Sequence, residues 1–267
     1  MIRVLNLISD TNIGGAGRVI LNYLRYADRE RFETLVAIPS GSLLKPLLEE
    51  TGVPVFEVDA MADRSFAKDD VQVLKELIRE VKPDLVHTHG CLSGRVAAKL
   101  CRVPVVYSRH SAFPVPAKIK YPPGRWANKI LNEALADHII AVSPATRDNL
   151  IEGGISTRKI TVVMNGVAPV KQTSAQEQEE MRKELGLTPD LTVFGILARI
   201  EDYKGHLYLI HAAKLLKDRG YTNFRILIAG TGAFEEEVSR AVVEMGADDV
   251  EHRGFLRRKK ILYMIPK

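Results

Sequence analysis

Three glycines follow the first apolar stretch of the chain, in the segment ISDTNIGGAGRVILNYL. Gly14, Gly15 and Gly17 stand between a strand-like run and a helix-like pattern, an order in which backbone N–H groups at a helix N-terminus bind an anion or a sugar. Arg18 adds a cationic donor in the first helical turn. The dinucleotide-binding pattern is incomplete, because Ile20 stands where its third glycine belongs. A tight turn explains one glycine, whereas three favour contact with a ligand.

Histidines form the second group of residues with chemical potential. His87 and His89 alternate along DLVHTHG and so share one face at the end of a predicted strand, and Arg109 and His110 end the later run VVYSRH. Ligands bind at the carboxyl ends of parallel strands. Side chains at the ends of neighbouring strands are therefore predicted to line a ligand-binding cleft. An isolated histidine is more often a hydrogen-bonded structural residue, and we expect at least one of the three to be structural.

Two cations mark a third candidate site. Arg199 follows the run GILA, and Lys204 stands five residues later, directly before Gly205 and a helix-like pattern. Two cations on such a loop can hold a diphosphate between them, although Arg and Lys are more often a solvated surface pair. A Gly-x-Gly pair, Gly230 and Gly232, follows the next strand-like run. One such pair is weak support, but its repetition in both halves of the chain favours ligand binding.

The elements that must position these residues alternate along the whole chain. Several strand-length runs are apolar on both faces, as buried parallel strands are. Strands are predicted at 2–8, 32–38, 53–58, 84–89, 103–108, 138–142, 160–164, 191–198, 224–230 and 250–253. Helices are predicted at 15–27, 42–52, 69–81, 124–136, 205–220 and 233–246. This alternation predicts an α/β protein with right-handed crossovers and doubly wound parallel sheets.

The alternation is interrupted once, which predicts two domains. Residues 168–190 are polar and then acidic, and are expected to link an N-terminal Rossmann-like domain at 1–167 to a second one at 191–267. The second domain supplies two clear strands and a short third, whereas a doubly wound domain normally has five or six. The sequence stops within the apparent helix FLRRKKILYMIPK. The second domain is therefore expected to be incomplete.

Composition narrows the class of protein. The 267 residues are 46% hydrophobic and 27% charged, as in ordinary globular proteins. Cys91 and Cys101 are the two cysteines, so we expect no disulfide framework, no metal site and a cytoplasmic location. The start, MIRVLNLISD, suits a first strand better than a signal peptide, and no apolar run has transmembrane length. A net charge of +5 suits a phosphorylated ligand or an anionic membrane, and nucleic-acid-binding motifs are lacking.

Taken together, the motifs resemble those of the retaining family-4 glycosyltransferases. The matching pieces are GGAGR, HTH, SRH, VSPATRDNL, VVMNGV, ARIEDYKG and IAGTG, with RGFL similar to the strand before the family's nucleotide pocket. The resemblance extends over essentially the whole chain. It implies the GT-B fold, in which two Rossmann-like domains face each other across a cleft. It also implies retaining transfer of a sugar from a UDP- or GDP-sugar to an acceptor hydroxyl, with no required cofactor, in cell-surface polysaccharide or glycolipid synthesis.

The resemblance assigns roles in the first domain. Gly14, Gly15 and Gly17 match the glycine loop near the acceptor and the donor phosphates, and His110 matches a catalytic-site histidine near the transferred sugar. By the same resemblance, the acceptor cleft is expected to be lined by Arg18, His87, His89 and Arg109. Asn165 and Gly166 stand where the family crosses between domains and are expected to be mainly structural.

The resemblance also assigns the donor site. Arg199 and Lys204 match the catalytic cations on the donor diphosphate, where they would stabilise the charge that develops on the β-phosphate. Gly230 and Gly232 match a turn beside the nucleotide.

One departure leaves alternatives open. Family members carry, beyond the point where this sequence stops, two donor-binding glutamates eight residues apart and a helix that returns to the first domain. The chain is therefore expected to be a fragment, a frameshifted product or half of a split enzyme. The alternatives are a catalytically inactive partner subunit of a split glycosyltransferase and a sugar-nucleotide epimerase, and GGAGR with RIEDYKG argues against the epimerase.

The stretch 111–130, SAFPVPAKIKYPPGRWANKI, suggests where an acceptor is presented. It combines Tyr121 and Trp126 with the basic residues Lys118, Lys120, Arg125 and Lys129. Aromatic rings and cations of this kind suit the interface of an anionic membrane, which predicts a lipid-linked acceptor and peripheral contact at the inner face of the membrane. The alternative is a proline-rich loop leading into a helix, with Trp126 packed on the sheet and a soluble sugar acceptor.

Overall fold

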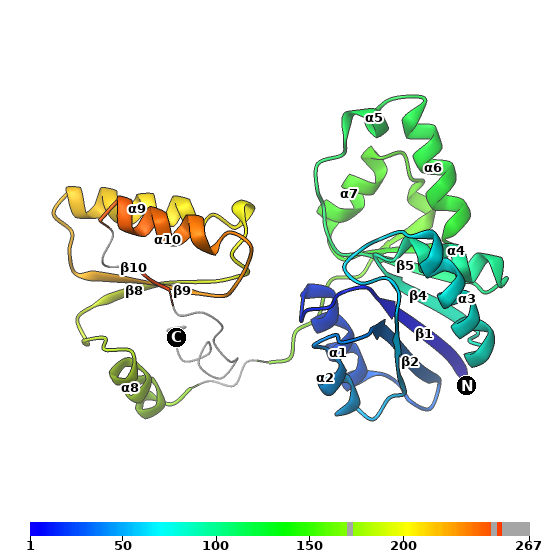
Figure 1. The fold of residues 1–267 in the computed structure, drawn as a ribbon, viewed down its shortest axis with the longest axis horizontal. Coiled ribbons are helices and arrows are strands. Elements are labelled where there is room, and N and C mark those ends of the chain that lie inside the picture. The colour runs from blue at the N-terminus through cyan, green and yellow to red at the C-terminus, as the bar shows by residue number, and fades with distance from the viewer. Residues whose placement is uncertain (170–172, 247–249, 253–267) are drawn as a thin grey trace. The chain divides into compact units, whose positions relative to one another are not determined.

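The computed structural model of the chain describes residues 1–169, 173–246 and 250–252. The chain forms two compact units, Met1–Ala168 and Pro169–Lys267, each with its own sheet and hydrophobic core (Figure 1).

The first unit is built on a seven-stranded parallel sheet. Its strands are β1 (Ile2–Ile8), β2 (Phe32–Pro39), β3 (Val55–Val58), β4 (Leu85–His89), β5 (Val105–Arg109), β6 (His138–Ala141) and β7 (Ile160–Val162). Their order in the sheet is β3-β2-β1-β4-β5-β6-β7, and every described pairing is parallel. The direction of winding reverses between β1 and β4, so the carboxyl ends of these two strands flank the switch point at which such sheets bind ligands.

Helices cover both faces of this sheet (Figure 1). They are α1 (Gly15–Tyr26), α2 (Lys45–Glu49), α3 (Lys68–Val81), α4 (Leu92–Leu100), α5 (Ala117–Lys120), α6 (Gly124–Leu135) and α7 (Pro144–Glu152), with a 3₁₀ turn at Thr157–Lys159. Side chains alternate along β1, so Leu5 and Leu7 join the core under α3 and α4, while Ile8 joins the core under α1 and α2. Asn6 therefore lies on the same face as Ile8, a point that matters for the site.

The predicted parallel α/β architecture is confirmed, but the sequence did not predict α4. Its core-facing positions are small residues, among them Ala97 and Ala98, so the apolar periodicity is weak. Small size is what its packing requires: a Cβ on Gly94 would lie 2.4 Å from Cδ1 of Leu7. The sequence pattern missed α4 because the close approach of this helix to the sheet selects small residues in place of large apolar ones.

The second unit has a three-stranded parallel sheet in the order β10-β9-β8 among its described residues. Its strands are β8 (Thr192–Leu197), β9 (Phe224–Ala229) and β10 (Val250–His252), and its helices are α8 (Ala175–Glu184), α9 (His206–Asp218) and α10 (Glu235–Glu244), with a 3₁₀ turn at Asp202–Lys204. In Figure 1, α9 and α10 cover one face of the sheet and α8 lies on the other. Ile210, Ile226 and Val238 belong to the core between the sheet and α9 and α10.

The segment 168–190, expected to be a linker, contains α8, and from Pro169 on it belongs to the second unit. Ser174 and Glu177 form a capping box that starts the helix, and Met181 and Leu185 are buried against Leu227 of β9. The polar composition that suggested a linker is that of the exposed face of a helix. The apparent helix FLRRKKILYMIPK lies outside the described residues.

Candidate functional site

Three histidines of the first unit, His87, His89 and His110, form one cluster. His87 and His89 are two residues apart on β4 and point to the same face, where they meet Ser108 of β5 and His110 directly after it. Nδ1 of His89 lies 2.9 Å from Nε2 of His110, and Nε2 of His87 lies 2.8 Å from the hydroxyl of Ser108. The ring centroids of His87 and His89 are 4.4 Å apart, and those of His89 and His110 are 5.1 Å apart.

Asn6 completes this cluster from the neighbouring strand. It is fully buried, it pairs in register with His87, and its Oδ1 lies 3.4 Å from Nε2 of His89. Sequence reasoning missed Asn6. The available signal was an amide side chain in the middle of the apolar run IRVLNLI, because a buried amide needs a hydrogen-bonding partner.

Burial keeps the cluster neutral. Removal from water lowers the pKa of His87 to about 4, with a smaller contribution from the charge of His110. Burial also lowers the pKa of His89 well below its usual value, and lowers that of His110. Neutral imidazoles donate and accept hydrogen bonds without charge, so the cluster is suited to hydroxyl groups, such as those of a sugar, more than to phosphate.

Arg109 does not join the cluster, although it precedes His110 in the chain. Adjacent strand residues point to opposite faces, and Arg109 donates from Nε to the carbonyl of Ser111 at 2.9 Å and from Nη1 to the hydroxyl of Tyr107 at 3.4 Å. The side chain of Arg109 is therefore directed away from the three histidines with which the sequence pattern grouped it.

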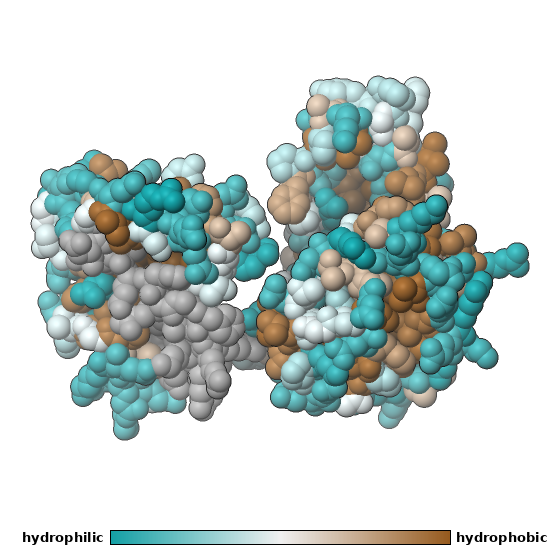
Figure 2. All heavy atoms as spheres, in the orientation of Figure 1, coloured by the Kyte–Doolittle hydropathy of each residue, from teal (hydrophilic) through white to brown (hydrophobic). Residues whose placement is uncertain are grey.

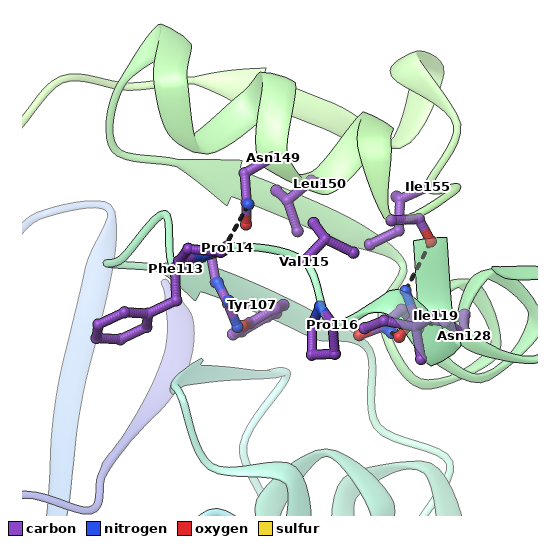
Figure 3. A pocket seen from close by; sticks show the side chains of 13 residues that line it. Tyr107, Phe113, Pro114, Val115, Pro116, Ile119, Asn128, Asn149, Leu150 and Ile155 are labelled. Carbon is purple, nitrogen blue, oxygen red and sulfur yellow. Dashed lines mark hydrogen bonds between the residues drawn. The ribbon is translucent and has the colours of Figure 1, made fainter. Parts of the chain in front are cut away.

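Arg109 instead lines a cavity of about 310 Å³ beneath the loop 111–116 (Figure 3). Tyr107 lies on its β5 side, and α6 and α7 supply the opposite walls. Asn149 donates to the carbonyl of Phe113 at 2.7 Å and holds the loop on α7, as the dashed line in Figure 3 shows. Much of the lining is apolar, with Val115, Pro116, Ile119, Leu150 and Ile155 among its residues. Arg109, Asn128 and Asn132 add polar groups to the same lining, which is therefore mixed in character.

The three glycines after β1 differ in what the structure requires at each position. Gly14 is the N-cap of α1, which has no side-chain cap and no acidic residue in its first turn. A Cβ on Gly17 would lie 2.6 Å from Cδ2 of Leu44, so Gly17 is required by the packing of α1. A Cβ on Gly15 would meet no atom within 4 Å, so the approach to the N-terminus of α1 is open there. Arg18 is exposed in the same turn.

The two predicted cations of the second unit are joined by a residue that the sequence analysis missed. Arg199 donates from Nη2 to the hydroxyl of Tyr203 at 3.2 Å, and Nζ of Lys204 lies over the Tyr203 ring, 5.1 Å from its centroid. Glu201 is 3.8 Å from Arg199, whose side chain is 65% exposed. Gly205, at φ +84°, then starts α9, which has no side-chain cap and no acidic residue in its first turn. The exposed cations Arg199 and Lys204 therefore lie next to the uncapped N-terminus of α9.

Gly230 and Gly232 are explained by backbone contact. A Cβ on Gly230 would lie 1.9 Å from the carbonyl oxygen of Ala198, and one on Gly232 would lie 2.1 Å from that of Ile200. The N–H of Gly232 already donates to Oε1 of Glu235 at 2.7 Å, and the first turn of α10 is acidic. These glycines let the loop pack beside Arg199, while α10 itself is a poor site for phosphate.

The described residues also bear on the predictions about metal ligands, membrane-spanning helices and the cysteines. Among the described residues no group of three His, Cys, Asp or Glu could hold a metal ion, and no helix is long and apolar enough to cross a membrane. Cys91 and Cys101 are free thiols. The carbonyl of Gly166 accepts from Asn22 at 3.1 Å, which ties the end of the first unit to α1.

In each unit, the first strand of a parallel sheet is followed by a helix whose N-cap is a glycine. Neither helix has a side-chain cap. Solved glycosyltransferase structures of the GT-B class share this fold. The family model for Glycosyltransferase Family 4 matches residues 13–171, and the model for glycosyl transferases group 1 matches residues 177–266. The chain belongs to Glycosyltransferase Family 4.

Named relatives agree with this family. The chain is 29% identical over 185 residues to D-inositol 3-phosphate glycosyltransferase of Corynebacterium efficiens, covering 63% of this chain and 44% of the relative. It is 26% identical over 217 residues to UDP-Gal:alpha-D-GlcNAc-diphosphoundecaprenol alpha-1,3-galactosyltransferase of Escherichia coli, covering 76% and 55%. The chain thus spans about half the length of these relatives. Anabaena HepE, solved with UDP and glucose, shares the fold with a TM-score of 0.78 at 21% identity, over 98% of this chain and 71% of HepE.

Proposed function

We propose that the chain acts in a glycosyltransferase that moves a sugar from a nucleotide-diphosphate sugar to an acceptor hydroxyl, with retention at the anomeric carbon. The observation that supports it most is the group formed by Arg199, Tyr203 and Lys204 at the open N-terminus of α9. Cleavage of the donor's glycosidic bond builds negative charge on the diphosphate, and two cations with backbone N–H groups stabilise such charge without a metal.

The donor is proposed to be a UDP-sugar. The E. coli relative is named for a UDP-sugar reaction, and HepE was solved with UDP. Retention rests on the family resemblance, and NMR of the product's anomeric proton tests it. An inverted product would contradict the retaining assignment and leave sugar transfer itself intact.

Removing the two cations tests the donor site. In Arg199→Ala and in Lys204→Ala, UDP binding or turnover should fall by about 10- to 150-fold each, because a charge-assisted contact contributes about 1.5–3 kcal/mol. Lys214→Ala is the matched control, since Lys214 lies further along α9, the helix whose N-terminus adjoins the two cations, and pairs with Asp218. Calorimetric titration with UDP and a transfer assay supply the measurements. Wild-type affinity and turnover in both variants would contradict the assignment.

The transfer assay also separates the alternatives. Product analysis that finds an epimerised nucleotide sugar, with no transfer, would support the epimerase. Binding of UDP by the 267-residue chain without turnover, and turnover only after a second glycosyltransferase chain is added, would support the partner subunit.

The acceptor is proposed to be lipid-linked, in cell-surface polysaccharide or glycolipid synthesis, with the protein at the inner face of the membrane. On α6 the apolar residues Trp126 and Ile130, four positions apart, share one face and are 62% and 69% exposed, and Leu131 beside Ile130 is 49% exposed. Figure 2 shows hydrophobic surface on the first unit where Figure 1 draws α6. Packing of Trp126 on the sheet, the alternative prediction, is wrong. The cavity beneath the loop 111–116 lies beside this helix, which contributes Asn128 and Asn132 to its lining.

Not every basic residue of 111–130 is available to lipid. Lys120 pairs with Glu152 at 2.6 Å, and Arg125 donates to the carbonyl of Ile151 at 3.1 Å, so both hold α5 and α6 on α7. Lys118 is exposed, and Lys129 lies on α6. We assign the lipid-facing charge to Lys118 and Lys129.

Sedimentation with anionic phosphatidylglycerol vesicles tests this surface. The chain should bind at low salt and less at high salt, because Lys118 and Lys129 act through screened charge. Trp126→Ser with Ile130→Ser should reduce binding at least ten-fold, whereas Tyr221→Ser, which changes an exposed aromatic residue of the second unit, should not. No binding at low salt, or equal loss in the control, would favour a soluble acceptor.

A further inference from the structure

The hydrogen bonds through Asn6 have a definite direction. Its amide group spans two neighbours: Nδ2 lies 3.5 Å from the carbonyl oxygen of Leu35, and Oδ1 lies 3.4 Å from Nε2 of His89. A carbonyl oxygen accepts hydrogen bonds and cannot donate them, so the NH₂ end of the amide faces Leu35. The oxygen end of Asn6, a pure acceptor, therefore faces His89.

That direction determines the proton positions on the next two residues. Because Oδ1 of Asn6 accepts, Nε2 of His89 carries the proton, and in a neutral ring its Nδ1 is then unprotonated. Nδ1 of His89 must accept, and the neighbour that donates to it is Nε2–H of His110, 2.9 Å away. The remaining nitrogen of His110, Nδ1, is left as an acceptor.

The chain of hydrogen bonds ends at Nδ1 of His110. Nδ1 of His110 is buried and makes no hydrogen bond with any described residue. A buried acceptor without a partner destabilises the fold unless a ligand or water supplies a donor. His110 lies directly after β5, next to the switch point of the sheet.

We propose that Asn6 and His89 are positioning residues that hold His110 as its Nε2–H tautomer, so that Nδ1 is a fixed hydrogen-bond acceptor for a hydroxyl group of the sugar substrate. The nature of the ligand rests on the proposed function, but the tautomer does not. The opposite tautomer would present an N–H, which suits a carbonyl or phosphate oxygen. A fixed acceptor instead selects a ligand that donates, as a sugar hydroxyl does.

His87 lies in the cluster but outside this chain of hydrogen bonds. Its Nε2 meets the hydroxyl of Ser108, and its ring packs on that of His89. Ser108→Ala is therefore a matched control: it removes one buried hydrogen bond of the cluster and leaves the contacts of Asn6, His89 and His110 in place.

NMR of the full chain labelled with ¹⁵N-histidine reads each tautomer directly. At neutral pH, His89 and His110 should both show an unprotonated Nδ1 and a protonated Nε2. A protonated Nδ1 on His110 in the wild-type chain overturns the proposal, whatever the enzyme's activity.

Asn6→Leu tests whether Asn6 is the cause. Without the acceptor, His89 is free to donate from Nδ1 to His110, so the Nδ1 resonance of His110 should shift toward the protonated value. Ser108→Ala should leave that resonance unchanged. An unaltered His110 in a folded Asn6→Leu chain overturns the role of Asn6. If that variant does not fold, the wild-type tautomers still decide.

Deoxyfluoro analogues of UDP-glucose test the ligand. Fluorine cannot donate a hydrogen bond, so fluorination at the hydroxyl that meets His110 should weaken binding to the wild-type chain by about ten-fold or more. His110→Phe should lose this discrimination at the same position. Equal discrimination in both chains, at every position, overturns the hydroxyl assignment. Failure of UDP-glucose itself to bind would contradict the proposed function and leave the tautomer result standing.

Discussion

Lowering the pH from 7 to 5 should destabilise the first unit, and His87 accounts for a defined share of that loss. Burial holds the pKa of His87 at about 4, against 6.5 for an unhindered histidine. Between these values the unfolded chain binds a proton that the folded chain does not. The free energy of unfolding is therefore unaffected by the protonation of His87 above pH 6.5. It falls as the pH is lowered from 6.5 toward 4, because protons bind the unfolded chain preferentially.

The size of the effect follows from the two pKa values. For His87 alone, the step from pH 7 to pH 5 should remove about 2 kcal/mol of the free energy of unfolding. His89, whose pKa burial also lowers, adds a loss of the same sign. Small domains unfold at a cost of about 5–15 kcal/mol, so this loss is large enough to measure.

Urea unfolding of wild type and His87→Gln at both pH values isolates this share. Gln keeps a hydrogen-bonding group near Ser108 but does not titrate. Far-UV circular dichroism follows unfolding, and because Trp126 is the one tryptophan of the chain and lies in the first unit, any change in its fluorescence is assigned to that unit. The acid-induced loss should be smaller in His87→Gln by about 2 kcal/mol.

His138→Gln serves as the control, because His138 lies on β6 and bonds Thr161, outside the cluster. It should keep the wild-type dependence on pH. If wild type and His87→Gln lose equal stability between pH 7 and pH 5, then His87 is not held neutral by burial and the reasoning fails.

Glycine substitutions give two further predictions. Gly17→Ala should destabilise the first unit by about 1–3 kcal/mol, because its Cβ meets Leu44, whereas Gly15→Ala has open space and should keep wild-type stability in urea. A loss of UDP-sugar binding in stable Gly15→Ala would then report a ligand at the loop, and equal stability of both variants would contradict the packing argument. Gly230→Ala should destabilise the second unit by about 3 kcal/mol, because φ is +152° and its Cβ would meet the carbonyl of Ala198. Far-UV circular dichroism should show this loss while the Trp126 transition stays unchanged, and a wild-type melt of the second unit would refute it.

The sequence determined the framework because hydrophobic periodicity is a local property. The predicted strand 2–8 coincides with β1, and the predicted helix 205–220 contains α9. Strands that are apolar on both faces and alternate with helices have few ways to pack other than a parallel sheet covered on both sides. The positions of the glycine loop and of Arg199 and Lys204 at strand ends followed from the same pattern.

Contacts between distant residues were decided only by the tertiary structure. The direction of Arg109, away from His110, depends on the pleat of β5 and on its two acceptors, the carbonyl of Ser111 in the following loop and the hydroxyl of Tyr107 on β5. Asn6 meets His89 because β1 and β4, 83 residues apart at this contact, are neighbours in the sheet.

The reasons for the glycines were likewise tertiary. Gly17 is required by its close approach to Leu44, and Gly230 by its close approach to the backbone of Ala198. No local sequence pattern encodes these contacts. Polar spacing in 168–190 could not distinguish a linker from α8, because Met181 and Leu185 show their role only against Leu227 of the sheet. A sequence specifies which side chains are available at a strand end, but the pairing of strands and the packing of helices decide which of them meet.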